Sequence, residues 1–308
     1  MTGREQDKQL AEFQPAWPRL FGIAYRMLGT VAEAEDVVQD AWLRWQGTDQ
    51  AGVREPAAFL ATTVTRLAIN ALHSARARRE TYLGPWLPEP VATGDDPTLG
   101  AERAEALELA VLLLLERLSP TERAAYVLHE AFGYPYRQIA ELLETSEANA
   151  RQLARRARTR VTQGGTTKVS LDERNRLLEA FLTAAREGNL VILESLLAQD
   201  VVSISDGGGV VSAARVPVRG RSRVARFVLG VLAKFGQGIV SVPVEVNGQT
   251  AVLGVRDGRP VTLWALEIGP QGVQRLLIVA NPDKLQRLAG LAPRGSGPGV
   301  TFRHGTRS

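Results

Sequence analysis

Two short amphipathic segments in residues 136–161, YRQIAELLETSEANARQLARRARTRV, limit the possible folds of this chain more than any other feature. Apolar residues recur in both at helical spacing: Ile139, Leu142 and Leu143 in the first, and Ala150, Leu153, Ala157 and Val161 in the second. Residues 144–146, Glu-Thr-Ser, separate the two segments and favour a tight turn. The pattern therefore predicts a helix-turn-helix whose second helix packs through one side.

The outward side of that second helix is rich in arginine. Its basic residues are Arg151, Arg155, Arg156, Arg158 and Arg160, and no acidic residue follows Glu147 in the helix. A helix-turn-helix places its second helix in the DNA major groove, where Arg contacts guanine edges or phosphates. We therefore predict DNA binding. The alternative is a helical hairpin with a solvated basic face, since only four of the 37 basic residues are Lys.

The composition excludes several other classes of protein. The 308 residues are enough for about two or three domains. The chain has no cysteine, so disulfides and thiolate metal sites are excluded, and its three histidines (73, 129 and 304) are far apart. We expect no metal and no cofactor. The longest apolar run, near Leu109 to Leu115, is too short to cross a membrane, which predicts a cytoplasmic protein without membrane contact. A pI near 9.7 permits a polyanionic partner.

Residues 10–80 are predicted to be helical throughout. One amphipathic helix ends at Gly29, and Thr30 with Glu33 is expected to form a capping box for the next. The buried face of this second helix would comprise Ala34, Val37, Val38, Ala41, Trp42 and Trp45. A polar loop at 48–56 leads to a third helix over about 57–80, which ends in a basic cluster.

Residues 81–98, TYLGPWLPEPVATGDDPT, contain four prolines and are predicted to link two domains. A helix over about 99–118 is expected to follow. Ser119 with Glu122 then forms the capping box of another helix, with Pro120 at its first position. Residues 162–170, TQGGTTKVS, form a second predicted joint.

The last part of the chain has a different pattern. Helices are predicted near 171–187, 190–198 and 221–235, and strands at 201–205, 239–246, 250–257, 261–267 and 273–279. Asn247-Gly248 and Asp257-Gly258 lie between strands and favour hairpins. Helices followed by an antiparallel meander predict an α+β domain in which a curved sheet wraps helices. The tail from 290, rich in Gly, Pro and Arg, is expected to be disordered.

The order of these features resembles a bacterial sigma factor of the extracytoplasmic-function (ECF) class. The similar stretches are FGIAYRMLGTVAEAEDVVQDAWLRW (21–45) and AAFLATTVTRLAINALHSARARRE (57–80) for region two, and residues 118–158 for region four. One group of these sigma factors carries a fused SnoaL-like domain with a cone fold. WLPEP (86–90), DGGG (206–209) and NPDKL (281–285) resemble the sequence motifs typical of that group.

The resemblance implies a multidomain fold, with two all-α sigma domains followed by an α+β cone. Region two would occupy residues 1–80, the linker 81–98, region four 99–163, a joint 164–170, the SnoaL-like regulatory domain 171–289, and the tail 290–308. The implied partners are RNA polymerase core, through its beta-prime subunit, and promoter DNA.

The resemblance also assigns the sites. Core polymerase would bind Asp36, Gln39, Asp40 and Arg44, a polar stripe that would otherwise be a solvated helix face. The minus-ten element would contact Asn70, His73, Arg76, Arg78 and Arg79, with the loop 48–56 around a flipped-out base. By themselves, Asn70 and His73 are ordinary helix-surface residues. The minus-thirty-five element would contact Ser146, Glu147, Asn149, Arg151, Gln152, Arg155, Arg156 and Arg158.

A SnoaL-like fold also suggests an enzyme, since related folds include cyclases and isomerases. Proton transfer there usually needs a His beside Asp or Glu, and residues 171–289 contain no histidine. The acids available are Asp206, Glu245, Glu267 and Asp283. We therefore expect no catalysis. A small ligand in the cone remains open, with Phe227 and Trp264 as pocket walls or as plain core.

Regulation in cis is the remaining expectation for this domain, because a tethered domain acts at high effective concentration. We expect the DGGG and NPDKL segments to pack on or near WLPEP and to set how far regions two and four separate. The residues concerned are Trp86, Leu87, Pro88, Glu89, Pro90, Asp206, Gly207, Gly208, Gly209, Asn281, Pro282, Asp283, Lys284 and Leu285. The predicted function is an alternative sigma factor. The alternatives are a one-component regulator with a ligand-sensing domain, and a SnoaL-like enzyme fused to a DNA-binding module.

Overall fold

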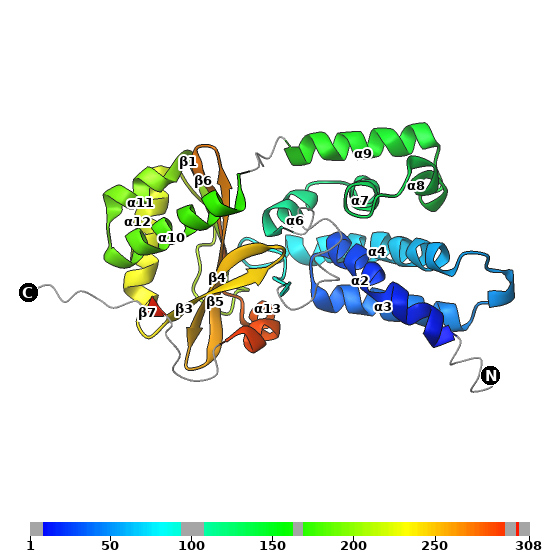
Figure 1. Ribbon diagram of the computed structural model, residues 1–308, viewed down its shortest axis with the longest axis horizontal. Helices are drawn as coiled ribbons and strands as arrows, with labels where there is room; N and C mark the ends of the chain where they lie inside the picture. Colours follow the sequence, from blue (N-terminus) through cyan, green and yellow to red (C-terminus); the bar gives the residue numbers. More distant parts are fainter. Residues whose placement is uncertain (1–8, 94–107, 163–168, 293–299, 302–308) are drawn as a thin grey trace, which may run out of the picture. The chain divides into compact units, whose positions relative to one another are not determined.

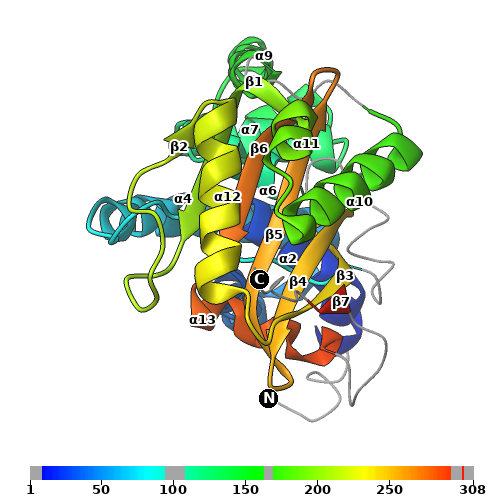
Figure 2. The same ribbon diagram turned by 90° about the vertical axis from the view of Figure 1, so that its left-hand side faces the viewer.

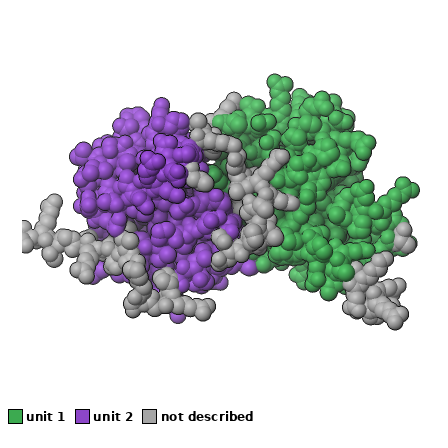
Figure 3. All heavy atoms as spheres, viewed as in Figure 1, with its two compact units in different colours: residues 1–81, 96–164 green, residues 82–95, 165–308 purple. Residues whose placement is uncertain are grey.

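The computed structural model describes residues 9–93, 108–162, 169–292 and 300–301. The chain forms two compact units (Figure 3). Unit 1 comprises residues 1–81 and 96–164, and unit 2 comprises residues 82–95 and 165–308. In the described part of the chain, no helix combines the length and the apolar character that a membrane span requires.

Unit 1 is helical throughout its described residues (Figure 1). Its first half contains η1 (Gln14–Ala16), α2 (Trp17–Leu28), α3 (Val31–Gln46), η2 (Gln50–Gly52) and α4 (Pro56–Glu80). Its second half contains α6 (Leu109–Leu115), α7 (Pro120–Tyr126), a π-helical turn η4 (Val127–Ala131), α8 (Tyr136–Leu142) and α9 (Glu147–Thr162). The order and type of these helices agree with the prediction.

Local sequence explains most of the helix ends in unit 1. Gly29 ends α2 in the left-handed conformation, with φ of 78°. Ser119 and Glu122 form the predicted capping box of α7. The capping box predicted at Thr30 is wrong. The Thr30 hydroxyl donates to the Glu33 carboxylate at 2.7 Å instead of accepting a backbone N–H.

The helix predicted over 99–118 does not run unbroken through its described part, residues 108–118. Glu108 is extended, with ψ of 136°, and the helix covers only Leu109–Leu115, while residues 99–107 lie outside the described residues. In the helix-turn-helix, Glu144 makes the turn with φ of 53°. The buried face of α9 comprises Ala150, Ala154, Ala157 and Val161, so Ala154 takes the buried place predicted for Leu153, which is half-buried.

Unit 2 is built on a seven-stranded sheet with the order β2-β1-β6-β5-β4-β3-β7. The strands are β1 (Leu197–Asp206), β2 (Val218–Arg219), β3 (Val240–Val246), β4 (Gln249–Arg256), β5 (Arg259–Gly269), β6 (Gly272–Val279) and β7 (Val300–Thr301). Asn247-Gly248 and Asp257-Gly258 connect β3 to β4 and β4 to β5. All four residues have positive φ, as a type I′ hairpin turn requires. Both predicted hairpins are confirmed.

The sheet is not a pure antiparallel meander, because β1 pairs with β6 in parallel. Helices α10 (Leu171–Glu187), α11 (Leu190–Leu196) and α12 (Arg221–Phe235) lie on one face of the sheet (Figure 2). The core between them contains Phe181, Val228, Trp264 and Ile278. The chain continues through α13 (Pro282–Leu285) and η5 (Gln286–Leu291).

The segment 82–93, called the linker segment below, groups with unit 2. Its Leu87 is buried, and so are Pro88, Glu89 and Pro90. In the tail predicted to be disordered, residues 290–291 end η5 and Val300–Thr301 pair with β3. Residues 293–299 and 302–308 lie outside the described residues.

Candidate nucleic-acid and polymerase interfaces and the linker contact

The stripe predicted to bind core polymerase lies on the exposed side of α3. Asp36, Gln39, Asp40 and Arg44 are all exposed, because the opposite side of the helix carries the buried Val37, Val38, Ala41 and Trp45. Leu43 lies within the stripe and is 57% exposed. An exposed Leu among charged groups is suited to a partner protein with complementary charge and a small apolar contact.

The residues predicted to bind the minus-ten element differ in their exposure to solvent and in their bonding partners. Asn70, His73 and Arg78 are exposed on α4. Arg76 donates to the Leu118 carbonyl, and Arg79 is paired with Glu116 and Glu33, with its side chain only 12% exposed. In this arrangement, Arg76 and Arg79 hold the two halves of unit 1 together.

The residues predicted to bind the minus-thirty-five element lie on and before α9. All except Asn149 are exposed: Ser146, Glu147, Arg151, Gln152, Arg155, Arg156 and Arg158. Asn149 is half-buried and donates to the Thr145 hydroxyl at 2.8 Å. Arg151 forms an ion pair with Glu147 at 2.9 Å and lies 5.4 Å from the Tyr136 ring centroid. The arginine face is therefore open to a large anionic partner.

Arginines from α2 and α4 join the first half of unit 1 to the second. Arg66 donates to the Leu142 carbonyl at 3.2 Å and pairs with Glu144 at 2.9 Å, so α4 contacts the turn of the helix-turn-helix. Arg19 donates to the Phe132 carbonyl at 3.1 Å. These bonds satisfy carbonyl groups near helix ends, which have no partner within their own helices.

Glu116 and Arg123 form the buried centre of this interface. Arg123 is fully buried, pairs with Glu116, and donates from Nε to the Arg26 carbonyl at 2.9 Å. Burial alone would raise the pKa of Glu116, but the charges and hydrogen bonds of Arg123 and Arg79 outweigh it and lower the pKa. Burial lowers the pKa of the Arg123 guanidinium, an effect that Glu116 opposes. The interface thus depends on an ionised Glu116.

In unit 2, Asp206 is the centre of the contacts with the linker segment. Its side chain is 0% exposed, and its carboxylate accepts hydrogen bonds from Tyr82 Oη at 2.6 Å, the Leu87 amide at 2.9 Å, the Gly208 amide at 3.0 Å and Lys284 Nζ at 2.7 Å. Four donors from three separate segments satisfy one buried carboxylate, as a buried charge requires. The DGGG, WLPEP and NPDKL segments therefore meet at this residue.

Lys284 and Asn281 complete the contact. Lys284 also donates to the Leu87 carbonyl and lies 4.4 Å from the Trp86 ring centroid, a cation–π distance. Asn281 donates to Tyr82 Oη at 2.9 Å and caps α13. Burial, followed by the hydrogen bond to Asp206, raises the pKa of the Tyr82 hydroxyl, so it stays a donor.

The close approach of these segments explains why the DGGG segment contains glycine. Gly208 has φ of 64°, and a Cβ on it would lie 2.5 Å from Asn281 Cγ. Gly209 has φ of 74°, and its Cβ would meet Leu83 at 3.1 Å. A side chain at either position would force the loop away from the linker segment or from α13.

A second contact holds residues 91–93 against the β3–β4 hairpin. The Asn247 side-chain oxygen accepts from the Val91 amide at 3.0 Å, and the Asn247 amide donates to the Val91 carbonyl at 2.9 Å. The Thr93 amide donates to the Glu245 carbonyl at 3.2 Å, and Ala92 bridges Val246. Sequence reasoning used Asn247 only as a turn residue and missed this role.

Other residues in these contacts were also missed. Tyr82 and Arg66 were interpreted only as parts of a loop and a helix, and the buried Arg26 and Arg123 and the half-buried Glu116 were not singled out. The available signal in the sequence was Glu116 directly after an apolar run and Arg123 directly before Ala124 and Ala125. No cluster of three or more His, Asp or Glu side chains in the described part of the chain is arranged to hold a metal.

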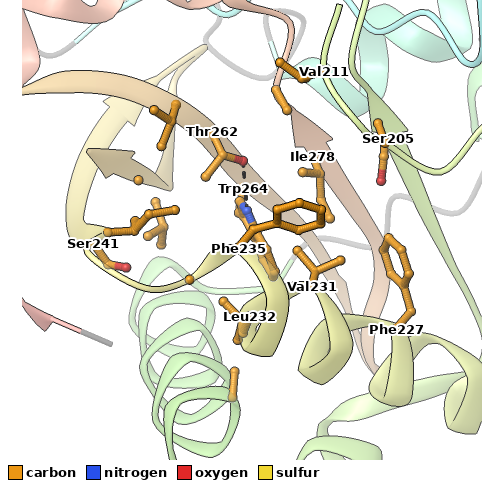
Figure 4. Close-up of a pocket in the computed structure, with 18 of the residues that line it drawn as sticks. Ser205, Val211, Phe227, Val231, Leu232, Phe235, Ser241, Thr262, Trp264 and Ile278 are labelled. Atoms are coloured by element: carbon orange, nitrogen blue, oxygen red, sulfur yellow. Dashed lines mark hydrogen bonds between the residues drawn. The ribbon is translucent and has the colours of Figure 1, made fainter. Parts of the chain in front are cut away.

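A cavity of about 620 Å³ lies between the helices and the sheet of unit 2 (Figure 4). Phe227 and Trp264, predicted as pocket walls or core, both line it. Asp206, Glu245, Glu267 and Asp283 are not among its lining residues, and Glu267 is paired with Arg275 at 2.8 Å. These acids are therefore not arranged as an acid–base pair in this cavity.

Comparison with known proteins matches both halves of unit 1 to sigma factors. Residues 14–78 match the family model of Sigma-70 region 2, and residues 108–161 match that of Sigma-70 region 4. The ECF RNA polymerase sigma factor SigJ of Mycobacterium tuberculosis is 40% identical over 291 residues, which cover 90% of this chain and 93% of SigJ. A protein of M. tuberculosis named "Probable ECF RNA polymerase sigma factor SigI" is 30% identical over 87% of this chain and 92% of its own.

The fold is matched over nearly the same length. The crystal structure of M. tuberculosis SigJ superposes with a TM-score of 0.74 at 39% identity and covers 89% of this chain and 97% of that one. The predicted fold class, two helical sigma domains followed by an α+β domain, is thereby confirmed. From the identity, the coverage and the two region models together, the chain belongs to the extracytoplasmic-function sigma factors, which bind RNA polymerase core and direct transcription from promoters.

Proposed function

We propose that unit 2 regulates this sigma factor in cis by holding the linker segment, which restrains the separation of region two from region four. Region two corresponds to the helices α2–α4 and region four to α6–α9. The contacts of Asp206 with Tyr82 and Leu87 are the observation that carries the proposal.

Within this proposal, the α3 stripe binds the polymerase core on its beta-prime subunit. Asp36, Gln39 and Asp40 present oxygen and amide groups to a basic partner, and Arg44 extends the stripe by one turn. Exposed polar groups spaced along one helix face support this assignment, because charge complementarity sets the orientation of a partner helix.

The DNA contacts of the proposal divide between the two regions. Asn70, His73 and Arg78 contact the minus-ten strand directly, and Arg76 and Arg79 join them after release from region four. In α9, Arg151, Gln152 and Arg155 read base edges of the minus-thirty-five element, with Ser146, Glu147 and Asn149 at the start of the helix. Arg156 and Arg158 bind phosphates.

The two DNA-binding surfaces lie too close together in unit 1 to read both elements at once. Arg66, one turn before Asn70, is 2.9 Å from Glu144, which lies two residues before Ser146. Elements centred near minus ten and minus thirty-five are about 25 base pairs apart, or roughly 85 Å at about 3.4 Å per base pair. Promoter binding therefore requires region two and region four to separate.

The linker segment affects how far they can separate. Its twelve residues, 82–93, would span up to about 40 Å if fully extended. They cannot extend while they are bound through Asp206 and Asn247. Release of the linker segment would therefore lengthen the connection between the regions by tens of ångströms.

A disulfide that locks the linker segment to unit 2 tests the proposal. Ala92 and Val246 form an antiparallel bridge flanked by the bonds Thr93 N to Glu245 O and Asn247 N to Val91 O, which makes them a non-hydrogen-bonded pair. The Cα atoms of such pairs are about 4.5 Å apart, within the range for a disulfide. The chain has no cysteine, so Ala92→Cys with Val246→Cys forms only this bond.

The measurement is in vitro transcription with purified core polymerase of the same organism and no other sigma factor. We expect the oxidised double variant to bind core but to initiate far less than the same protein reduced before assembly. The two single-cysteine variants, treated with the same oxidant, are the controls and should initiate like the reduced protein. Equal initiation by the oxidised and reduced forms would contradict regulation through the linker segment.

A further inference from the structure

The cavity of unit 2 lies beside the linker contact and has no part in it. It is bounded by α10, α12 and strands β1 and β3 to β6, and the loop that follows the DGGG segment forms one wall through Val211, Ser212, Ala213 and Ala214. Its volume of about 620 Å³ falls in the size range of small-molecule sites in proteins.

The lining of the cavity is mostly apolar. Side chains that line it include Phe181, Phe227, Val231, Phe235, Trp264 and Ile278. Figure 4 shows Phe227, Val231 and Phe235 of α12 on one side and Trp264 and Ile278 of the sheet near them. Among the described lining residues, Arg256 alone is charged, and its guanidinium donates to the Phe235 and Gln237 carbonyls near the end of α12. An ionic group deep in this cavity would lose its hydration without gaining a counter-charge.

One polar group in the wall lacks a partner. Ser205 is 4% exposed, and its Oγ has no hydrogen-bond partner among the described residues. By contrast, the Thr262 hydroxyl in the same wall accepts from Trp264 Nε1 at 3.0 Å. A buried hydroxyl without a partner is unfavourable, and a bound molecule with a hydrogen-bonding group would remove that penalty.

We propose that this cavity binds an uncharged, mainly apolar small molecule that makes one hydrogen bond with Ser205. The apolar side chains exclude water and contact the body of the ligand, as in small-molecule sites generally. Ser205 orients it. Such binding does not require the linker segment to be held or released.

The test uses the full-length protein and the neutral fluorescent probe 1-aminoanthracene. We expect saturable binding with one probe per chain and a rise in probe fluorescence. Anthracene-1-carboxylate has the same ring system with a negative charge, and we expect it to bind at least about tenfold more weakly because its carboxylate would be desolvated. Equal or tighter binding of the carboxylate would overturn the proposal of an uncharged ligand.

Substitutions at Val231 and Ser205, with Val191→Trp as a control, test whether the probe binds in the cavity. Val231→Trp places a much larger side chain in the cavity from α12 and should strongly weaken saturable binding. Val191→Trp adds the same side chain at a position that is 78% exposed on α11, and it should leave binding unchanged. Ser205→Ala should weaken 1-aminoanthracene binding several-fold but leave the binding of 1-methylanthracene, which lacks the amino group, unchanged.

Ser205→Ala removes only one oxygen atom and is compatible with folding, so weaker binding by this variant can be distinguished from unfolding. The circular dichroism spectrum and melting temperature of each variant establish that it is folded. Absence of saturable binding in the natural sequence, or unchanged binding in a folded Val231→Trp protein, overturns the proposal. Equal effects of Ser205→Ala on both neutral probes would also overturn the role of Ser205.

Discussion

Two carboxylates, one half-buried and one buried, stabilise contacts of different kinds within the two units. Glu116 in unit 1 is surrounded by charge, with Arg79 and Arg123 as its partners. Asp206 in unit 2 has one charged partner, Lys284, and three neutral donors, of which two are backbone amides. The first contact joins region two to region four, and the second joins the linker segment to unit 2.

The different partners of Glu116 and Asp206 affect how easily each contact can open. Charge–charge contacts respond to pH and to competing anions, and a DNA backbone is a competing anion for Arg76 and Arg79. Hydrogen bonds from backbone amides inside a buried site do not respond in this way. We therefore expect the interface between regions two and four to open reversibly on its own, and the linker contact to set how far it opens.

The largest expected effect comes from Asp206→Asn. The variant leaves Lys284 buried without its counter-charge, which costs about 3–5 kcal/mol. We expect the linker segment to detach, so that amide hydrogen exchange at Leu87 and Val91 speeds up while the β5–β6 core stays protected. Asp283→Asn, an exposed neighbour, is the matched control and should change stability by less than about 0.5 kcal/mol. Unchanged exchange at Leu87 in a folded Asp206→Asn protein would refute the central role of this carboxylate.

The next effect concerns Glu116→Gln, which removes the charged partner of the fully buried Arg123 and should weaken the interface between regions two and four by about 3 kcal/mol. Because the folded pKa of Glu116 is lowered, its stabilising contribution is complete above the ordinary value near 4.5 and is lost as the pH falls through the lowered value. We expect acid to open unit 1 in the natural protein.

Small-angle X-ray scattering between pH 6 and pH 3 measures that opening. The Glu116→Gln protein should already be extended at pH 6 and should respond less to acid. Glu141→Gln, at an exposed position on α8, is the control. If the natural protein and Glu116→Gln were equally compact at pH 6, the ion pair would not hold the interface.

The smallest effect concerns DNA reading by α9. Arg151→Ala should cost about 1–3 kcal/mol for the cognate minus-thirty-five element and relax its specificity at one position. Arg158→Ala should weaken all sequences about equally and reduce the salt slope by about one. Holoenzyme binding to promoter fragments at several salt concentrations measures both. An unchanged footprint and salt slope for Arg151→Ala would remove it from the DNA interface.

Local interactions made most of the fold predictable. Asn247-Gly248 and Asp257-Gly258 specify hairpin turns through their own backbone preferences, and the apolar spacing of residues 136–161 specifies a helix-turn-helix. Thr30 was mispredicted because the sequence alone does not fix the direction of its hydroxyl. An unbroken helix through residues 108–118 was mispredicted, because Glu108 is extended and the helix ends at Leu115.

Long-range contacts were harder to predict. The parallel pairing of β1 with β6 joins residues more than seventy positions apart, and nothing in either strand specifies the partner. The Asp206–Leu87 and Asn247–Val91 bonds connect segments separated by 119 and 156 positions. Family resemblance indicated which segments to compare, but only the structure identifies Asp206 and Lys284 as the buried pair. Whether the assigned DNA and polymerase residues act as expected stays a prediction.

The separation of regions two and four can be measured directly by fluorescence energy transfer. Ala32→Cys on α3 and Thr159→Cys on α9 are both exposed, and the absence of native cysteine makes labelling specific. We expect a mainly short distance with a minor long-distance population in the free labelled protein, a long distance when core polymerase and promoter DNA are bound, and a larger long-distance population in the free Asp206→Asn variant. Identical distance distributions in the free protein with and without Asp206→Asn would contradict this expectation.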